Sequence, residues 1–88
     1  MKIKQGYILR EVGTLAVVVA VGAAHENFHK ILTLNKTGAF LFNMLTENQE
    51  YENLVNALCE KYDVDFATAQ CDVDEFINQL KTVGLLED

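Results

Sequence analysis

The side chains that could carry chemistry in this chain are two histidines, two cysteines and several carboxylates. His25 and His29 are four residues apart, a spacing that on a helix would aim both imidazoles at one metal ion. They stand instead in GAAHENFH, a segment expected to be a loop, and no neighbouring cluster of cysteines or carboxylates supplies further ligands. We therefore expect no metal site and interpret both histidines as solvated loop residues.

The cysteines and carboxylates indicate no catalysis either. Cys59 and Cys71 are too few for a disulfide framework, and each lies in a helix-like segment, where a free thiol behaves as a small buried hydrophobe. Asp72 and Asp74 are paired, but acid–base catalysis needs a pocket that shifts their pKa values. Both fall beside or outside the apolar stripe of their helix. We expect no catalytic residues, no cofactor and no enzymatic activity.

The spacing of apolar residues predicts the strands and helices that must position these side chains. It changes once, near residue 35, from a period of about 2 residues to one of about 3.6. Before it, alternation and apolar runs predict strands at 6–12, 14–21 and 30–34. The unbroken run TLAVVVAV is typical of a strand in the middle of a sheet. Short connections predict an antiparallel meander, which leaves the third strand, KILTL, at an edge.

After residue 35, apolar residues recur at helical spacing and predict helices at 36–46, 50–62 and 65–83. Asn35 can cap the first helix, and Asp63 or Asp65 the third. Gly84 fits the left-handed position just past the last helix, where Leu85 can fold back. Three helices on one face of a three-stranded antiparallel sheet make an α+β, winged helix-turn-helix-like domain, and we expect one such domain over residues 1–88.

The apolar stretch LAVVVAVGAA is shorter than the ~20 residues that a membrane helix needs, and it lacks the basic start and cleavage site of a secretory signal. We therefore expect a cytoplasmic protein that does not enter a membrane. The charge is uneven, because residues 47–88 hold eleven carboxylates against two lysines. This acidic half repels phosphate and disfavours nucleic acid as a partner.

A winged helix that binds DNA is nevertheless the main alternative suggested by the element order. Its recognition helix should present Arg or Lys to phosphates and base edges. The third helix instead carries Asp72, Asp74 and Glu75, with Lys81 as its only basic residue. Two further alternatives are a small enzyme, for which the sequence offers no convergent polar groups, and a self-associating structural subunit.

Three segments together resemble a known family. They are LTLNKTGAF at the strand-to-helix join, LVNALCEKYDVD through the second helix and DVDEFINQLKTVGLLED at the end. In this order and spacing they resemble the PqqD family, whose members are precursor-peptide recognition elements of ribosomally made, modified peptides. The resemblance extends over roughly residues 6 to 87.

The resemblance implies a non-catalytic, winged-helix-like peptide chaperone. Such a domain binds the leader of a precursor peptide and hands it to a modifying enzyme, of the radical SAM type for PqqD. The leader would add as a strand beside KILTL, in a groove bordered by the last helix, because an unpaired strand offers a ladder of donors and acceptors. The expected peptide-binding residues are Lys30, Ile31, Leu32, Thr33, Gln70, Val73, Asp74, Ile77 and Lys81.

The sequence allows alternatives for the groove, the oligomeric state and the product. The opposite flank of the last helix, with Asp72 and Gln79, is the alternative border of the groove. Val73 and Ile77 can equally be core residues alone, and an exposed edge can pair with itself, so a monomer or a weak dimer is expected. The chain reads HENFHKI where a Pro-Glu-Gly-like segment is expected in pyrroloquinoline quinone synthesis, so another modified peptide is an equal alternative.

Overall fold

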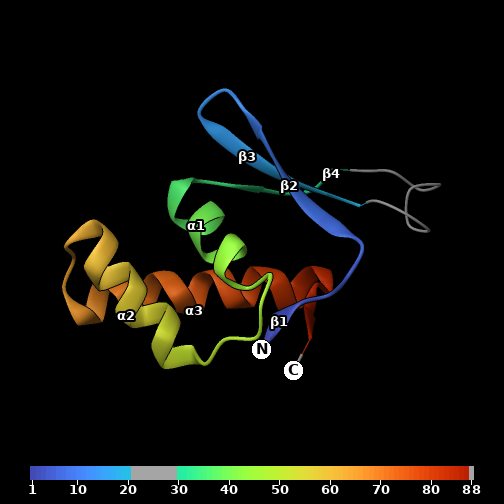
Figure 1. Cartoon of the computed structure of the whole chain (residues 1–88). Coiled ribbons are helices and arrows are strands. Elements are labelled where there is room, and N and C mark those ends of the chain that lie inside the picture. Colours follow the sequence, from blue (N-terminus) through green and yellow to red (C-terminus); the bar gives the residue numbers. More distant parts are fainter. Residues whose placement is uncertain (21–29, 88) are drawn as a thin grey trace.

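The computed structural model describes residues 1–20 and 30–87, and the side chains of all of these except residues 30 and 31. The segment GAAHENFH, with His25 and His29, and Val21 of the second predicted strand therefore lie outside the described residues. The described part holds a three-stranded antiparallel sheet followed by three helices, as expected for an α+β, winged-helix-like fold (Figure 1).

The sheet is formed by β2 (Tyr7–Val12), β3 (Leu15–Ala20) and β4 (Lys30–Leu34), in the order β2-β3-β4. Both pairings are antiparallel, so the predicted meander with a central second strand is confirmed. Gly13 makes the tight turn between β2 and β3 possible, because its φ of +65° lies in the left-handed region that L side chains rarely adopt. β4 is an outer strand, with β3 as its partner on one side.

The helices are α1 (Lys36–Met44), α2 (Tyr51–Tyr62) and α3 (Phe66–Val83). The Gly38 N–H donates to Asn35 Oδ1 at 2.8 Å, and the Thr68 N–H donates to Asp65 Oδ1 at 2.8 Å, so both predicted caps are present. Glu50 is the N-cap residue of α2, and its side chain makes no capping hydrogen bond.

α3 ends as expected at Gly84, whose φ is +73°. The Leu85 N–H donates to the Leu80 carbonyl at 2.9 Å, and both leucines are fully buried in the core. This left-handed ending turns the chain back toward the core and sends it into a further short strand.

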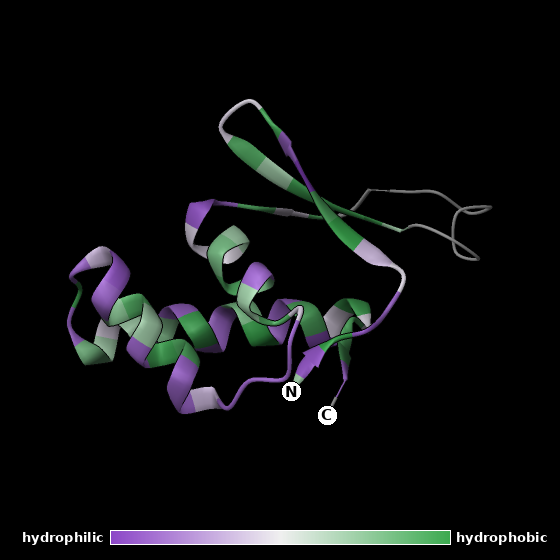
Figure 2. Ribbon diagram, in the orientation of Figure 1, coloured by the Kyte–Doolittle hydropathy of each residue, from purple (hydrophilic) through white to green (hydrophobic). Residues whose placement is uncertain are grey.

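The three helices lie on one side of the sheet, with α1 between the sheet and α3 (Figure 1). β3 is coloured hydrophobic along its whole length, and its Ala16, Val18 and Ala20 are buried (Figure 2). The cross-strand partners of these three residues on β4 include Leu34 and Leu32, which share their face of the sheet. That face therefore supplies the sheet side of a single core with α1, α2 and α3.

Two further strands, which the sequence did not indicate, form a separate two-stranded sheet. β1 (Lys2–Ile3) pairs antiparallel with β5 (Leu86–Glu87), so segments near the two ends of the described chain lie side by side. Ile3 is buried, and its N–H donates to the Leu45 carbonyl at 2.8 Å. Strands of two residues are too short to show a period, and their partner lies more than eighty residues away in the sequence.

Candidate functional site

The junction of β4 and α1 positions one wall of the candidate site. Asn35 stops the strand and caps the helix, and Gly38 lets the first turn of α1 approach β4 closely. A Cβ at Gly38 would lie 3.2 Å from both Cβ and Cδ2 of Leu34, which is tighter than ordinary van der Waals contact. The strand therefore passes directly into the helix with little room between them.

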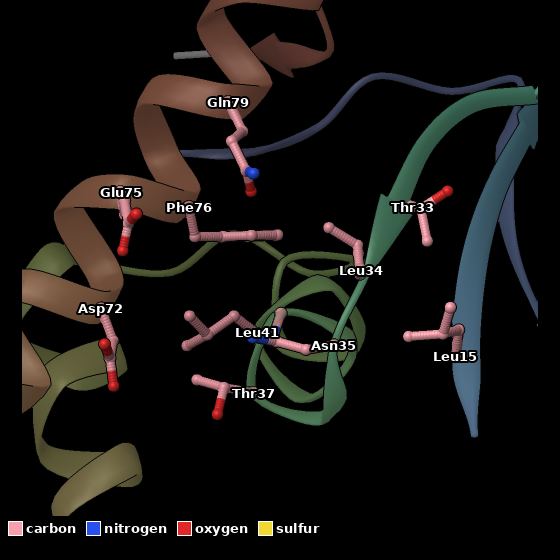
Figure 3. A pocket seen from close by; sticks show the side chains of 11 residues that line it. Leu15, Thr33, Leu34, Asn35, Thr37, Leu41, Asp72, Glu75, Phe76 and Gln79 are labelled. Carbon is pink, nitrogen blue, oxygen red and sulfur yellow. The ribbon is translucent and has the colours of Figure 1, made fainter.

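A pocket of about 350 Å³ opens between this junction and α3 (Figure 3). β4 and α1 form one wall, four residues of α3 form the facing wall, and Leu15 of β3 lies at the far side. The lining residues are Leu15, Thr33, Leu34, Asn35, Thr37, Gly38, Leu41, Asp72, Glu75, Phe76 and Gln79. The buried Leu34, Leu41 and Phe76 give the pocket an apolar floor beneath a polar rim.

The α3 wall is acidic. Asp72, Glu75, Phe76 and Gln79 follow the spacing i, i+3, i+4, i+7, so they share one side of the helix. Figure 3 shows the two carboxylates together on this wall, with Thr37 on the facing α1. The pocket lining includes no lysine, arginine or histidine among the described residues, so its charge is negative.

The structure brings only part of the predicted peptide-binding set to this pocket. Lys30, Ile31, Leu32 and Thr33 all belong to β4, and Thr33 lines the pocket. Leu32 is half-buried and packs on the core.

The predicted residues of α3 lie elsewhere on that helix. Gln70, Asp74 and Lys81 fall on the side opposite the pocket wall, at 100° per residue. Val73 and Ile77 are core residues, with exposed fractions of 0% and 9%. The border named as the alternative, with Asp72 and Gln79, is the one that lines the pocket.

Asp74 has a partner on the neighbouring helix. The Tyr51 hydroxyl of α2 donates a hydrogen bond of 2.7 Å to Asp74 Oδ1. This hydrogen bond, with lesser effects of burial and of the negative charge of Asp74, raises the pKa of Tyr51 above its ordinary 10.0. Asp74 therefore serves the α2–α3 contact, and its place in a peptide groove on this side stays a prediction.

Sequence reasoning named Asp72 and Gln79 only as an alternative and missed Glu75, Phe76 and Thr37. The common spacing of the four α3 residues was the available signal, because it places them on one side of the helix. The side of α3 that faces β4 depends on how the helix packs, and the local sequence of α3 does not predict this packing.

Other chemistry-bearing residues do not gather in the described structure. Residues 1–20 and 30–87 contain no group of three or more His, Cys, Asp or Glu side chains that could hold a metal ion. Cys59 is half-buried and packs on the core, but Cys71 is exposed, contrary to the expected burial, because its position on α3 lies outside the apolar stripe. No described helix is long and apolar enough to cross a membrane.

Comparison with known proteins shows the family to which this chain belongs. Residues 8–86 match the family model described as Coenzyme PQQ synthesis protein D (PqqD). The chain belongs to the PqqD family. The PqqD model includes β2, β3, β4 and all three helices, and therefore both walls of the pocket.

A solved structure gives the same result for the fold. The PqqD-family chain is similar to the structure of TbiB1 in complex with the TbiA(beta) leader peptide, with a TM-score of 0.73 and 25% sequence identity. The similarity covers 99% of this chain and 95% of that one. No curated protein matches the chain in sequence.

Proposed function

We propose that this protein is a non-catalytic peptide chaperone, which captures the leader of a precursor peptide by strand addition to β4. The outer position of β4 beside the pocket is the observation that carries the proposal. An extended peptide can pair with the free side of an outer strand through its backbone, with little demand on sequence. The complex of the similar TbiB1 with a leader peptide supports a peptide as the ligand.

The pocket supplies what backbone pairing lacks, which is selection among peptides. Side chains of a strand alternate between the two faces of its sheet. Every second side chain of the added peptide would therefore lie on the helix side of the sheet and meet the floor formed by Leu34, Leu41 and Phe76. On this model the peptide contacts β4 over residues 30–34 and the side of α3 with Asp72, Glu75 and Gln79.

The protein would then present the bound leader to a modifying enzyme. The proposal assigns the chemistry to that separate enzyme and leaves peptide binding to this chain. Membership of the PqqD family supports an enzyme of the radical SAM type. The pathway leads to pyrroloquinoline quinone or to another modified peptide, and the functional unit is a monomer or weak dimer.

Strand addition can be tested with a synthetic leader of the protein's cognate precursor peptide. Titrated into isotope-labelled protein, the leader should shift the amide resonances of residues 30–34 and of the pocket side of α3. Two further peptides would carry N-methyl groups at alternate positions, one at the odd and one at the even residues. Because a strand directs alternate N–H groups to opposite sides, one set should abolish binding and the other should be tolerated.

Two results would contradict strand addition. The first is a leader that binds and leaves the amides of residues 30–34 unmoved. The second is equal binding by both N-methylated peptides, since a peptide paired with β4 must lose one set of donors.

A further inference from the structure

The α3 wall of the pocket carries charge of one sign. Of the eleven lining residues in the described part of the chain, Asp72 and Glu75 are acidic and the other nine are uncharged. Asp72 is half-buried, while Glu75 is exposed at the rim. Lys36, which begins α1, lines a separate pocket together with Glu11 and does not line this one.

Among the described side chains, neither of these two carboxylates takes part in a hydrogen bond. The carboxylate hydrogen bonds within the described part of the chain involve Asp65, which caps α3, and Asp74, which accepts from Tyr51. Asp72 and Glu75 stand one helical turn apart, so both can reach the same bound group. A half-buried carboxylate with no counter-charge among the described side chains, at the side of an apolar pocket, favours a cation that enters with the ligand.

We infer that the groove selects leader peptides with a Lys or Arg that faces Asp72 and Glu75. This inference rests on the proposed function, because it concerns the peptide that pairs with β4. The pocket that lies beside the outer strand points to a peptide, and the two carboxylates then specify its charge. A leader with an acidic residue at the same position is disfavoured by like-charge repulsion.

The geometry also sets the spacing within the leader. From Asp72 to Gln79 the helix rises by about 10 Å, the length of about three residues of extended peptide. Two side chains on the same face of that peptide, at positions i and i+2, therefore span the wall. The basic residue occupies one position, and the other lies against Phe76 and Gln79, where an apolar or amide side chain fits.

Selection from a displayed library of short random peptides tests this inference without the natural precursor. Three immobilised proteins are compared: the wild type, the double variant Asp72→Asn with Glu75→Gln, and the double variant Glu47→Gln with Glu60→Gln. The last is a matched control, since it removes two exposed carboxylates outside the pocket and changes the net charge equally. Selected peptides are then titrated into labelled wild-type protein to identify those that shift the amides of residues 30–34.

Peptides that bind at β4 should be enriched in Lys or Arg from the wild type and from the control. The enrichment should disappear with Asp72→Asn, Glu75→Gln, and an individual selected peptide should bind this variant about tenfold more weakly, as expected for partly exposed ion pairs. Peptides that shift the β4 amides without basic enrichment, or with enrichment unchanged in the pocket variant, would overturn this inference alone. Absence of any peptide that shifts those amides would overturn strand addition and this inference together.

Discussion

At the scale of single residues, the contact between Tyr51 and Asp74 joins α2 to α3 on the side of α3 opposite the pocket. Its 2.7 Å hydrogen bond is made by a neutral phenol and a carboxylate, so it depends on the protonation state of Tyr51. Asp74 and Asp72 are two residues apart but have different surroundings, because successive helix positions are rotated by about 100°. Asp74 accepts a hydrogen bond from α2, whereas Asp72 lines the pocket.

The raised pKa of Tyr51 leads to a prediction about pH. The folded pKa lies above the unfolded value of 10.0, so the hydrogen bond stabilises the fold fully below that pH and is lost as the pH rises through the folded pKa. Tyr51→Phe should therefore lower the free energy of unfolding at neutral pH, and the difference from the wild type should disappear at high pH. Urea unfolding of both proteins over a pH series measures this difference.

Tyr62→Phe is the control for loss of a phenol hydroxyl, since its contact with the Lys36 carbonyl is long, at 3.4 Å. It should cost less stability at neutral pH than Tyr51→Phe. A cost of Tyr51→Phe that is the same at every pH would contradict the assigned role of the hydrogen bond.

At the scale of elements, the ends of the helices depend on a few residues with defined local geometry. Gly84 ends α3 with a positive φ, and a Cβ placed there would meet nothing within 4 Å. The cost of a side chain at this position is therefore one of backbone conformation alone.

Gly84→Ala should lower the free energy of unfolding by about 1 kcal/mol, because L residues other than Asn and Asp are disfavoured in the left-handed region. Gly84→Asn is the matched comparison and should cost clearly less, since Asn tolerates this conformation. Urea unfolding measures both. Equal stability of the Ala variant and the wild type would show that the left-handed ending does not limit stability.

The same elements show how far local sequence determines this fold. Asn35, Asp65 and Gly84 act on their own neighbours in the chain, so their caps and the α3 ending were predictable from sequence. The sheet order followed from short connections and the apolar run of β3. β1 and β5 were missed, because two residues carry no pattern and their pairing depends on the completed fold.

The candidate site was predictable only in part, for a related reason. The edge position of β4 follows from the strand order, which the sequence indicated. The side of α3 that faces β4 is set by packing of α1 between them, so the sequence could not choose between Asp72 with Gln79 and Gln70 with Lys81. The prediction that Cys71 is buried was wrong for the same reason, because its side of α3 is open to solvent.

At the scale of the whole molecule, the formal net charge of −6 determines which large ligands can approach. Acidic residues crowd the helical part of the chain, and α3 presents Asp72, Asp74 and Glu75 where a DNA-reading helix would need Arg or Lys. The resulting field repels polyanions and attracts cationic segments.

We therefore expect no association with duplex DNA even at low salt, where phosphate contacts are strongest. Fluorescence anisotropy of a labelled random-sequence duplex measures this directly. Under the same conditions, a leader peptide with a suitably placed Lys or Arg should bind. DNA binding that weakens steeply as salt is added would contradict this expectation and favour a DNA-binding winged helix.

The pairing of β1 with β5 has a mechanical consequence. Lys2 lies opposite Glu87 and Ile3 opposite Leu86, so the pair nearest the two chain ends is Lys2 with Glu87. A force that pulled the two ends apart would load these pairs one after another, as in opening a zipper, and not all at once. Ile3 would then leave its buried place beside Leu45, so tension would first loosen the helical layer at this corner, with the β2-β3-β4 sheet still intact.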